Sequence, residues 1–295
     1  MKTAVVALGG NAFQPAGEKW SYKQLVRNVD NTCEILKVLT KNYRLVISHG
    51  NAPQVGLLLL QQESTALAPK MPLDVLDAMT QGQLGYLIQN ALNERLKAKA
   101  VTVITQVLVD SHDPAFKHPT KPIGPYYKKR IEENMVRQPG GWRRVVASPK
   151  PLRIIEIDEI KSLVKSGYVV ITCGGGGIPV VKEGGELRGI EAVIDKDLAA
   201  AVLAEDVKAD MLIILTDIKA VFLNYRKGRG CEMELRKTTP EDAARYMKEG
   251  HFAPGSMGPK VQAAIDFALK GGKTIITSPK YLEDAMKGDA GTLIE

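Results

Sequence analysis

The sequence predicts an α/β layered sandwich built around a mostly parallel sheet. Short apolar runs rich in β-branched residues alternate with longer amphipathic segments, an order typical of parallel sheets covered by helices. The composition agrees, since hydrophobic residues make up 44% and charged residues 25% of the 295 residues. A chain of this length buries a sufficient core without disulfides or a structural metal, and its composition excludes collagen, a coiled coil and wholesale disorder.

Six apolar runs are expected to form the strands of the sheet. In chain order they are residues 3–8, 44–48, 101–109, 168–172, 211–215 and 273–277. The helices are expected between them, in residues 25–39, 74–97, 197–207 and 260–269. One face of the first helix is apolar, made by Leu25, Val29, Cys33, Leu36 and Leu39.

The cysteine pattern and the hydropathy predict a cytoplasmic protein. Cys33, Cys173 and Cys231 are far apart and lack the spacing of a zinc site or a disulfide framework, so we expect reduced, buried thiols. No apolar run approaches the roughly 20 residues that a membrane-spanning helix needs. The apolar run at the N-terminus is too short for a signal peptide.

The net charge of +7 is confined to one segment. Residues 112–153 hold ten basic and three acidic residues, so the rest of the chain is neutral. The segment also holds seven of the 16 prolines and Trp142. We expect an insertion poor in regular structure. An excess of basic over acidic residues is compatible with binding to nucleic acid, to an anionic membrane or to an anionic small substrate.

Three expected strands end in glycine-rich loops. These loops are Gly9-Gly10-Asn11, Ser48-His49-Gly50-Asn51 and Cys173-Gly174-Gly175-Gly176-Gly177. Ligands of open α/β sheets bind at the carboxyl ends of the strands, and glycine lets backbone N–H groups approach an anion closely. A single glycine pair is also compatible with an ordinary tight turn. Three such loops together predict a site for phosphate or another anion.

The common nucleotide and metal fingerprints do not fit. The run Gly271-Gly272-Lys273-Thr274 resembles the end of a Walker A loop, but Phe267 stands at the first glycine position and a strand follows instead of a helix. In the four-glycine loop, Pro179 breaks the GxGxxG pattern. The four histidines lack metal-ligand spacing, and no GxSxG motif indicates a hydrolase. We expect no metal ligands from the protein.

Charged residues stand near the same strand ends. Lys196 lies between Asp195 and Asp197, just before an alanine-rich helix. Either aspartate can be a simple helix N-cap. Alternatively, one carboxylate orients lysines and Lys196 faces a phosphate. The pair Thr216-Asp217 directly follows the strand at 211–215 and places a further carboxylate at the ligand edge.

Two other lysines are candidates for phosphate contacts. Lys260 opens an expected helix, where the helix dipole disfavours a cation unless a bound anion reverses the field. Lys260 is therefore our first candidate for a catalytic cation. Lys121 lies between Pro119 and Pro122, which either stiffen a presented lysine or form a rigid surface connection.

Six motifs together resemble the carbamate kinases, in the order of that family. They are residues 6–12 (VALGGNA), 48–56 (SHGNAPQVG), 119–124 (PTKPIG), 174–180 (GGGGIPV), 190–197 (IEAVIDKD) and 255–261 (GSMGPKV). The likeness extends from residue 3 to residue 277 or beyond. It implies the amino-acid-kinase fold, a three-layer α/β/α sandwich around a mainly parallel sheet, with a small protruding subdomain at about 112–150.

The resemblance also implies an activity and an organisation. Carbamate kinases transfer phosphate reversibly between ATP and carbamate, giving carbamoyl phosphate and ADP, with Mg²⁺ carried by the nucleotide. The expected assembly is a homodimer without nucleic-acid or membrane partners. Residues 1–190 are expected to form the acceptor lobe, which includes the protruding subdomain, and residues 191–295 the nucleotide lobe.

The resemblance assigns roles to individual residues. The implied catalytic residues are Lys121, Lys196, Lys260 and Asp197. The implied substrate-binding residues are Gly9, Gly10, Asn11, Gly50, Asn51, Gly175 and Gly176. The implied nucleotide-binding residues are Lys196, Thr216, Asp217, Tyr225, Met257 and Lys260. Many relatives, such as acetylglutamate kinase, carry lysine where this chain has Ala7, and we expect Lys121 to supply the missing charge.

Two other functions are compatible with the sequence. A kinase of the same fold could act on another acceptor, such as an acylated amino acid or a nucleoside monophosphate. The basic segment could instead bind nucleic acid with a strongly salt-dependent affinity, although its aromatic residues for base stacking are limited to Tyr126, Tyr127 and Trp142.

Overall fold

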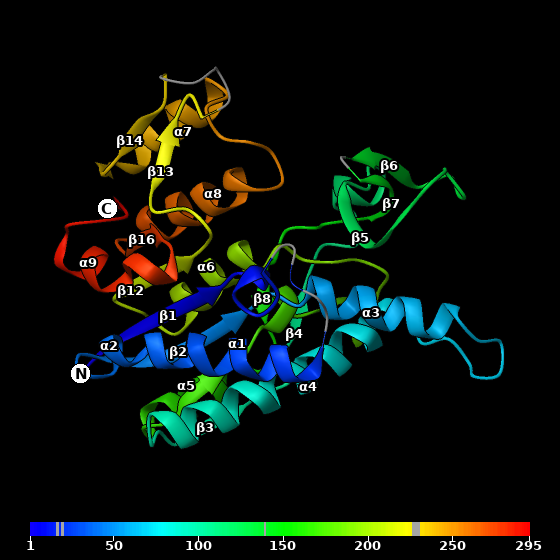
Figure 1. Ribbon diagram of the computed structural model, residues 1–295, viewed down its shortest axis with the longest axis horizontal. Helices are drawn as coiled ribbons and strands as arrows, with labels where there is room; N and C mark the ends of the chain where they lie inside the picture. The colour runs from blue at the N-terminus through cyan, green and yellow to red at the C-terminus, as the bar shows by residue number, and fades with distance from the viewer. Residues whose placement is uncertain (16–17, 19–20, 139, 226–230) are drawn as a thin grey trace.

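The computed structural model describes residues 1–295 except 16–17, 19–20, 139 and 226–230, and of Asn11 and Pro125 it describes only the backbone. Within the described residues an eight-stranded sheet runs through the molecule in the order β15-β17-β16-β12-β1-β2-β9-β3 (Figure 1). Its strands are β1 (Lys2–Leu8), β2 (Tyr43–His49), β3 (Ala100–Thr102), β9 (Val169–Ile171), β12 (Met211–Leu215), β15 (Lys237–Thr238), β16 (Lys273–Thr277) and β17 (Thr292–Ile294). From β3 to β16 all neighbouring strands are parallel.

Both faces of this sheet are buried, which explains its nearly continuous apolar strands. Along β1, Ala4, Val6 and Leu8 pack into one core. Val5 and Ala7 pack into the core on the opposite face. The helices that contribute buried residues to the first core are α1 (Tyr22–Ile35), α2 (Lys37–Thr40), α4 (Leu73–Arg95) and α9 (Leu282–Lys287). The helices of the second core are α5 (Ile157–Lys165), α6 (Lys196–Asp206), α7 (Pro240–Lys248) and α8 (Met257–Ala268). The expected three-layer α/β/α sandwich is confirmed.

The expected strand at 101–109 is wrong, because this segment divides between two sheets. Strand β3 pairs with β9 in the main sheet, whereas β4 (Gln106–Leu108) joins a smaller sheet of order β11-β10-β4-β8. The break lies at Thr105, whose backbone N–H donates to Gln81 Oε1 and whose carbonyl accepts from Gln81 Nε2. The carbonyl of Thr105 also accepts from Ile178 N of β10 at 2.9 Å, so the ladder of the smaller sheet begins at this residue. The other strands of the smaller sheet are β8 (Arg153–Ile154), β10 (Ile178–Glu183) and β11 (Glu186–Gly189).

The basic segment also differs from expectation, since it forms a regular three-stranded antiparallel sheet. The order is β5-β7-β6, and the strands are β5 (Lys121–Tyr127), β6 (Met135–Gln138) and β7 (Gly141–Val146). Proline is tolerated because β5 is an edge strand and its register shifts between Ile123 and Tyr127. In Figure 1 this sheet projects from the molecule beside α3 (Ala52–Glu63). Val55 and Leu59 of α3 and Ile123 of β5 share a small core.

The remaining elements connect these layers. They are the hairpin of β13 (Val221–Leu223) and β14 (Met233–Leu235), and the 3-10 turns η1 (Gly10–Ala12), η2 (Pro114–Phe116), η3 (Gly174–Gly176) and η4 (Pro279–Tyr281). Cys33 and Cys173 are buried as expected, but Cys231 is exposed. In the described part of the chain, no helix has the length and apolar character needed to cross a membrane.

Candidate active site

The glycine loops lie together at the carboxyl edge of the main sheet. Backbone hydrogen bonds fix them, because Gly9 N donates to Leu215 O at 3.1 Å and Gly50 N donates to Leu8 O at 2.9 Å. A Cβ atom on Gly50 would lie 2.8 Å from Gly10 N and 3.5 Å from Lys196 Cδ. The chain therefore needs glycine at position 50, where two loops and a lysine side chain meet.

A buried cluster of two lysines and one carboxylate stands above these loops. Lys260 Nζ donates to Asp197 Oδ2 at 2.9 Å, and Lys196 Nζ donates to Asp197 Oδ1. Asp197 is 2% exposed. Its neighbour Asp195 caps α6, because Asp195 Oδ1 accepts from Asp197 N at 2.9 Å. Asp195 forms the helix cap and Asp197 forms the lysine contacts, while the phosphate contact of Lys196 stays a prediction.

The charges in this cluster depend on one another. Burial alone would raise the pKa of Asp197, but the ammonium groups of Lys196 and Lys260 outweigh burial and lower that pKa. Burial lowers the pKa of Lys196, helped by Lys260 and opposed by Asp197. For Lys260, burial lowers the pKa, but the contacts with Asp197 outweigh it and the pKa is raised. With all three groups charged, two cations face one anion, which leaves a positive charge for an anionic ligand.

Lys121 joins the cluster from the basic sheet. Its Nζ lies 2.8 Å from Asp195 Oδ2, so Asp195 uses one oxygen to cap α6 and the other to hold Lys121. The Lys121 side chain is 29% exposed. The first residue of β5 is thereby brought to the start of the helix that carries Lys196 and Asp197.

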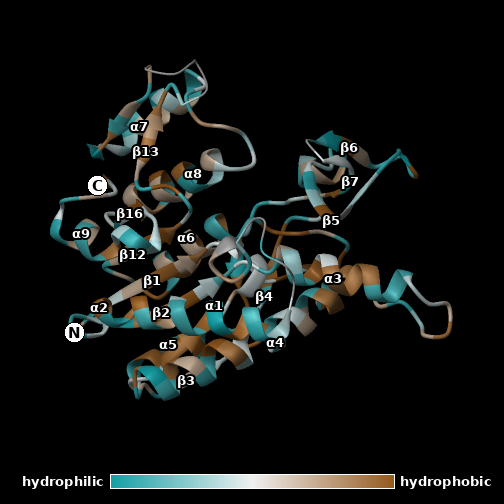
Figure 2. Ribbon diagram, in the orientation of Figure 1, coloured by the Kyte–Doolittle hydropathy of each residue, from teal (hydrophilic) through white to brown (hydrophobic). Residues whose placement is uncertain are grey.

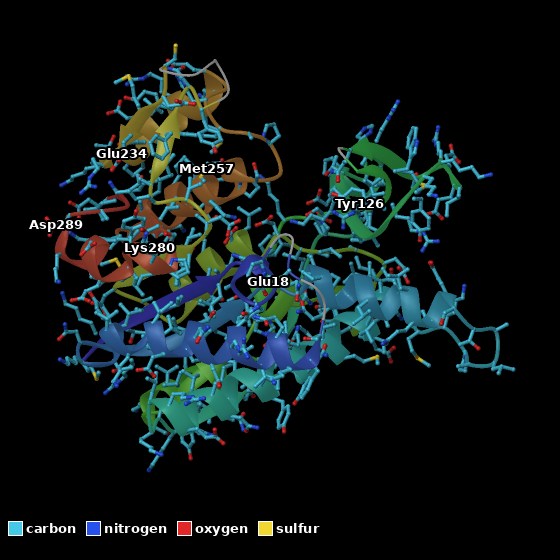
Figure 3. The ribbon with its side chains drawn as sticks, in the orientation of Figure 1. Glu18, Tyr126, Glu234, Met257, Lys280 and Asp289 are labelled. Carbon is cyan, nitrogen blue, oxygen red and sulfur yellow. The ribbon has the colours of Figure 1, made fainter. Side chains whose placement is uncertain are left out.

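A pocket of about 400 Å³ opens beside the two buried lysines. Its lining includes the predicted site residues Gly9, Gly10, Lys196, Thr216, Asp217, Tyr225, Met257 and Lys260. It also includes Gly255 and Ser256 of the sixth motif, Ile218 and Phe222 between the predicted Asp217 and Tyr225, and His251 and Ala253. Figure 3 shows Met257 on the side of the C-terminal helices and Tyr126 on the basic sheet. The lining combines lysine and aspartate groups with the aromatic rings of Phe222 and Tyr225, which suits a ligand with an anionic part and a flat part.

The remaining predicted residues lie on the other side of the lysine cluster, and the side chain of Asn11 lies outside what the structure describes. Asn51 Nδ2 donates to Asp77 Oδ1 and, at 2.8 Å, to Thr80 Oγ1. Gly175 has a φ of +71°, and a Cβ there would lie 2.3 Å from Asn51 Nδ2. Gly176 has a φ of +102° and packs in the same way on Ile194 O. The loops after β2 and β9 therefore touch through glycine.

Comparison with known proteins identifies the family. The profile of the amino acid kinase family matches residues 2–278. Carbamate kinase of Pyrococcus furiosus is 46% identical over 99% of each chain, and carbamate kinase 1 of Enterococcus faecium is also 46% identical over 99% of each chain. The structure of carbamate kinase from Giardia lamblia bound to AMP-PNP superposes with a TM-score of 0.92 at 41% identity, covering 99% of this chain and 98% of that one.

The chain belongs to the carbamate kinases of the amino acid kinase family. Relatives outside the carbamate kinases share the fold alone: N-acetylglutamate synthase of Neisseria gonorrhoeae, with coenzyme A and L-arginine, has a TM-score of 0.61 at 14% identity, over 99% of this chain and 61% of that one. The resemblance drawn from the six motifs is confirmed.

Sequence reasoning missed several polar residues of this carbamate kinase. Asp77, Thr80 and Gln81 lie on the buried face of α4 and hold the loops of the site. Their spacing of three and four residues places them on one helical face, beside the apolar Leu84 and Ile88. Polar residues in an otherwise apolar helix face were the available signal. Glu191 was also missed, and its carboxylate accepts from Leu73 N at the start of α4.

The described residues contain no group of three or more His, Cys, Asp or Glu that could hold a metal ion. In the lining of the pocket Asp217 is the carboxylate, while both oxygens of Asp197 accept from lysines. This donor set does not form a cage of protein ligands. It is compatible with a cation that arrives on the phosphates of a nucleotide and keeps most of its waters.

The buried Asp77 gives a prediction for the pH dependence of stability. Burial raises its pKa from the ordinary value of 3.8 to about 7, against the opposing hydrogen bonds from Asn51 and Gln81. Between these two values unfolding releases a proton, so rising pH favours the unfolded chain. We expect the free energy of unfolding of Asp77→Asn, relative to the wild type, to increase by about 1.4 kcal/mol per pH unit between about pH 5 and pH 7. Urea unfolding at several pH values measures this difference, and a difference independent of pH would contradict the assignment.

Proposed function

We propose that this chain catalyses reversible phosphoryl transfer between ATP and carbamate, so that carbamoyl phosphate and ADP give carbamate and ATP. The observation that carries the proposal is the buried Lys196-Asp197-Lys260 cluster at the glycine-lined edge of the sheet. Membership of the carbamate kinases supports the same reaction, with AMP-PNP in the related Giardia structure supporting an ATP site.

The mechanism follows from the physics of phosphoryl transfer. The transition state spreads negative charge over the oxygens of the transferring group, and the protein contributes mainly alignment and cations. Lys196 and Lys260 would contact those oxygens from the start of α6 and the first turn of α8. Asp197 holds both ammonium groups in place. Carbamate is already an anion, so its attack on the phosphorus needs no general base from the protein.

The acceptor would lie beside the glycine loops and Asn51, and Lys121 would reach it from the basic sheet. The residues proposed to bind it are Gly9, Gly10, Gly50, Asn51, Gly175 and Gly176. Backbone N–H groups at the glycine loops would bind the oxygens of the acceptor and of the transferring phosphate. Asn11 belongs to the same proposed set. Ala7 is buried in the second core, so the first strand of this chain offers no cation at that position. Lys121 would then supply the cation from the basic sheet.

The nucleotide would occupy the pocket of about 400 Å³. Thr216 and Asp217 follow β12 at the polar end, while Phe222, Tyr225 and Met257 offer apolar surface for the base. Mg²⁺ would arrive on the nucleotide phosphates and neutralise part of their charge. On this division residues 1–190 form the acceptor lobe and residues 191–295 the nucleotide lobe, joined by the continuous main sheet.

We also propose a cytoplasmic homodimer. Val75, Met79 and Tyr86 are exposed at helical spacing on α4, and Leu57 and Leu60 are exposed on α3. Figure 2 shows hydrophobic residues along much of α3. Exposed apolar side chains grouped on neighbouring helices are typical of a protein interface. The free thiols of Cys33, Cys173 and Cys231 suit a reducing compartment.

A coupled assay tests the proposed function. Carbamoyl phosphate, ADP and Mg²⁺ are expected to yield ATP, and ATP with carbamate is expected to yield ADP in the reverse direction. A panel of alternative acceptors, namely N-acetylglutamate and a nucleoside monophosphate, distinguishes other kinases of this fold. Turnover of a panel member but not of carbamoyl phosphate would contradict the proposal.

A further inference from the structure

Asp77 is a buried carboxylate beneath the acceptor side of the site. It lies in the first turns of α4 and is 7% exposed. Its Oδ1 accepts from Asn51 Nδ2, and its Oδ2 accepts from Gln81 Nε2 at 3.4 Å. Both oxygens of Asp77 are therefore used as hydrogen-bond acceptors. It is not part of the pocket beside the lysines.

The hydrogen bond between Asp77 and Asn51 supports the glycine loop. A Cβ atom on Gly175 would lie 2.4 Å from Asp77 Oδ1 and 2.3 Å from Asn51 Nδ2. Gly175 therefore packs directly on this pair of side chains. A change in the orientation of the Asn51 amide would move atoms against the backbone of the loop after β9.

The same network reaches the loop through a second route. Gln81 binds both backbone groups of Thr105. Thr105 Oγ1 accepts from Cys173 N at 3.1 Å, just before the glycine loop. On the other side of that residue, Ser48 Oγ donates to Cys173 O at 3.0 Å. The carboxylate of Asp77 thus joins the loop after β2, through Asn51, to the loop after β9, through Gln81.

We propose that Asp77 is a positioning residue for the phosphoryl acceptor. Its carboxylate holds Asn51 and the Gly174–Gly176 turn in the geometry that binds the acceptor. This inference rests on the proposed function and adds a residue that would act through Asn51 without touching the substrate. It concerns the acceptor side alone, because the pocket for the nucleotide lies across the lysine cluster.

The chemistry requires a carboxylate at position 77. Asn51 and Gln81 each present an N–H donor to it, and only a carboxylate offers two acceptor oxygens. In Asp77→Asn one oxygen becomes an NH₂ group, which faces a donor. Either Gln81 Nε2 keeps Thr105 O as its one acceptor, or the Asn51 amide turns over and exchanges its oxygen and nitrogen beside Gly175. The shape of the side chain is preserved, so the substitution changes the hydrogen bonding and leaves the packing volume unchanged.

The test compares steady-state kinetics of the wild type and Asp77→Asn at about pH 8, above the pKa of Asp77. We expect kcat/KM for carbamoyl phosphate to fall about 10- to 100-fold, because small misplacements of a reacting group cost this much. The KM for ADP is expected to stay within about twofold of the wild type, since no contact of the nucleotide pocket changes. Asp74→Asn is the matched control, a carboxylate one turn earlier on α4 that lies against Gly189, and its kinetics should equal those of the wild type.

A second variant covers the case in which Asp77→Asn does not fold. Thr80→Val removes only the hydroxyl that accepts from Asn51. It should also lower kcat/KM for carbamoyl phosphate without changing the KM for ADP. Unchanged kcat/KM for carbamoyl phosphate in a folded variant would overturn the positioning role. A KM for ADP that rises as much as the KM for carbamoyl phosphate would overturn it as well. A wild type inactive with carbamoyl phosphate would overturn the proposed function and this inference with it, whereas an active wild type with unaffected variants overturns this inference alone.

Discussion

Replacing Asp197 with asparagine is expected to lower the free energy of unfolding by about 3–5 kcal/mol and to reduce kcat at least about 100-fold. The carboxylate is 2% exposed and accepts hydrogen bonds from Lys196 and Lys260. Asparagine removes the carboxylate that accepts from both ammonium groups and leaves Asp195 and, for Lys260, Asp217 to offset their charge, which favours loss of a proton from one lysine or its displacement from the site. Urea unfolding and the coupled assay on folded protein measure the two effects.

The control for Asp197→Asn is Glu205→Gln on the same helix. Glu205 is an exposed residue that pairs with Lys270 near the other end of α6. Exposed ion pairs contribute little to stability, so we expect the free energy of unfolding to change by no more than about 0.5 kcal/mol and turnover to stay normal. Wild-type stability and turnover in Asp197→Asn would show that the two lysines are held by other groups.

Alanine at Lys260 is expected to reduce kcat by about 100-fold, which corresponds to a barrier about 3 kcal/mol higher. The ammonium group would stabilise charge that develops on the transferring phosphoryl group, and neither water nor alanine replaces a cation fixed by Asp197. We expect kcat to fall in Lys121→Ala as well, because Lys121 brings its cation to the site from the basic sheet. Both variants should fold, because each removal leaves Asp197 or Asp195 another partner.

Lys270→Ala is the matched control for Lys260→Ala. Lys270 follows the same helix, and its side chain is 60% exposed. Its removal should leave turnover unchanged. Full activity of Lys260→Ala or of Lys121→Ala in the coupled assay would remove the role proposed for that lysine.

The sequence predicted those parts of the fold that depend on local pattern. Strands β1, β2, β12 and β16 agree with the expected runs to within one residue at each end, because strands buried on both faces need continuous apolar residues. The glycine loops could also be located, since glycine marks the close approach of Gly50 to Gly10. Helix-start signals identified Lys196 and Asp197.

Features that depend on distant residues could not be predicted. The break near Thr105 is imposed by Gln81, which lies 24 residues earlier on α4. The bond between Asp77 and Asn51 joins residues 26 positions apart, and the pair of Lys121 with Asp195 joins residues 74 positions apart. No local pattern encodes such contacts. They appear only when the sheet has brought its loops together.

The basic segment shows how composition alone misled the prediction. Its prolines and charges indicated irregular structure, yet its aromatic rings are contacted by Arg143 and Arg144 of β7 and by Arg130 of the loop between β5 and β6. Arg143 lies 5.2 Å from the ring centre of Tyr126, Arg144 lies 5.7 Å from Tyr127 and Arg130 lies 6.0 Å from Trp142. These cation–π contacts stabilise β5 and β7.

Direct transfer of a labelled phosphoryl group tests the central claim. Carbamoyl phosphate carrying ³²P is incubated with ADP, Mg²⁺ and enzyme, and the nucleotides are separated from inorganic phosphate. We predict that the label appears in the γ-phosphate of ATP with the wild type and at about one hundredth of that rate with Lys260→Ala. Label found only in inorganic phosphate, or equal transfer by both proteins, would contradict phosphoryl transfer at the lysine cluster.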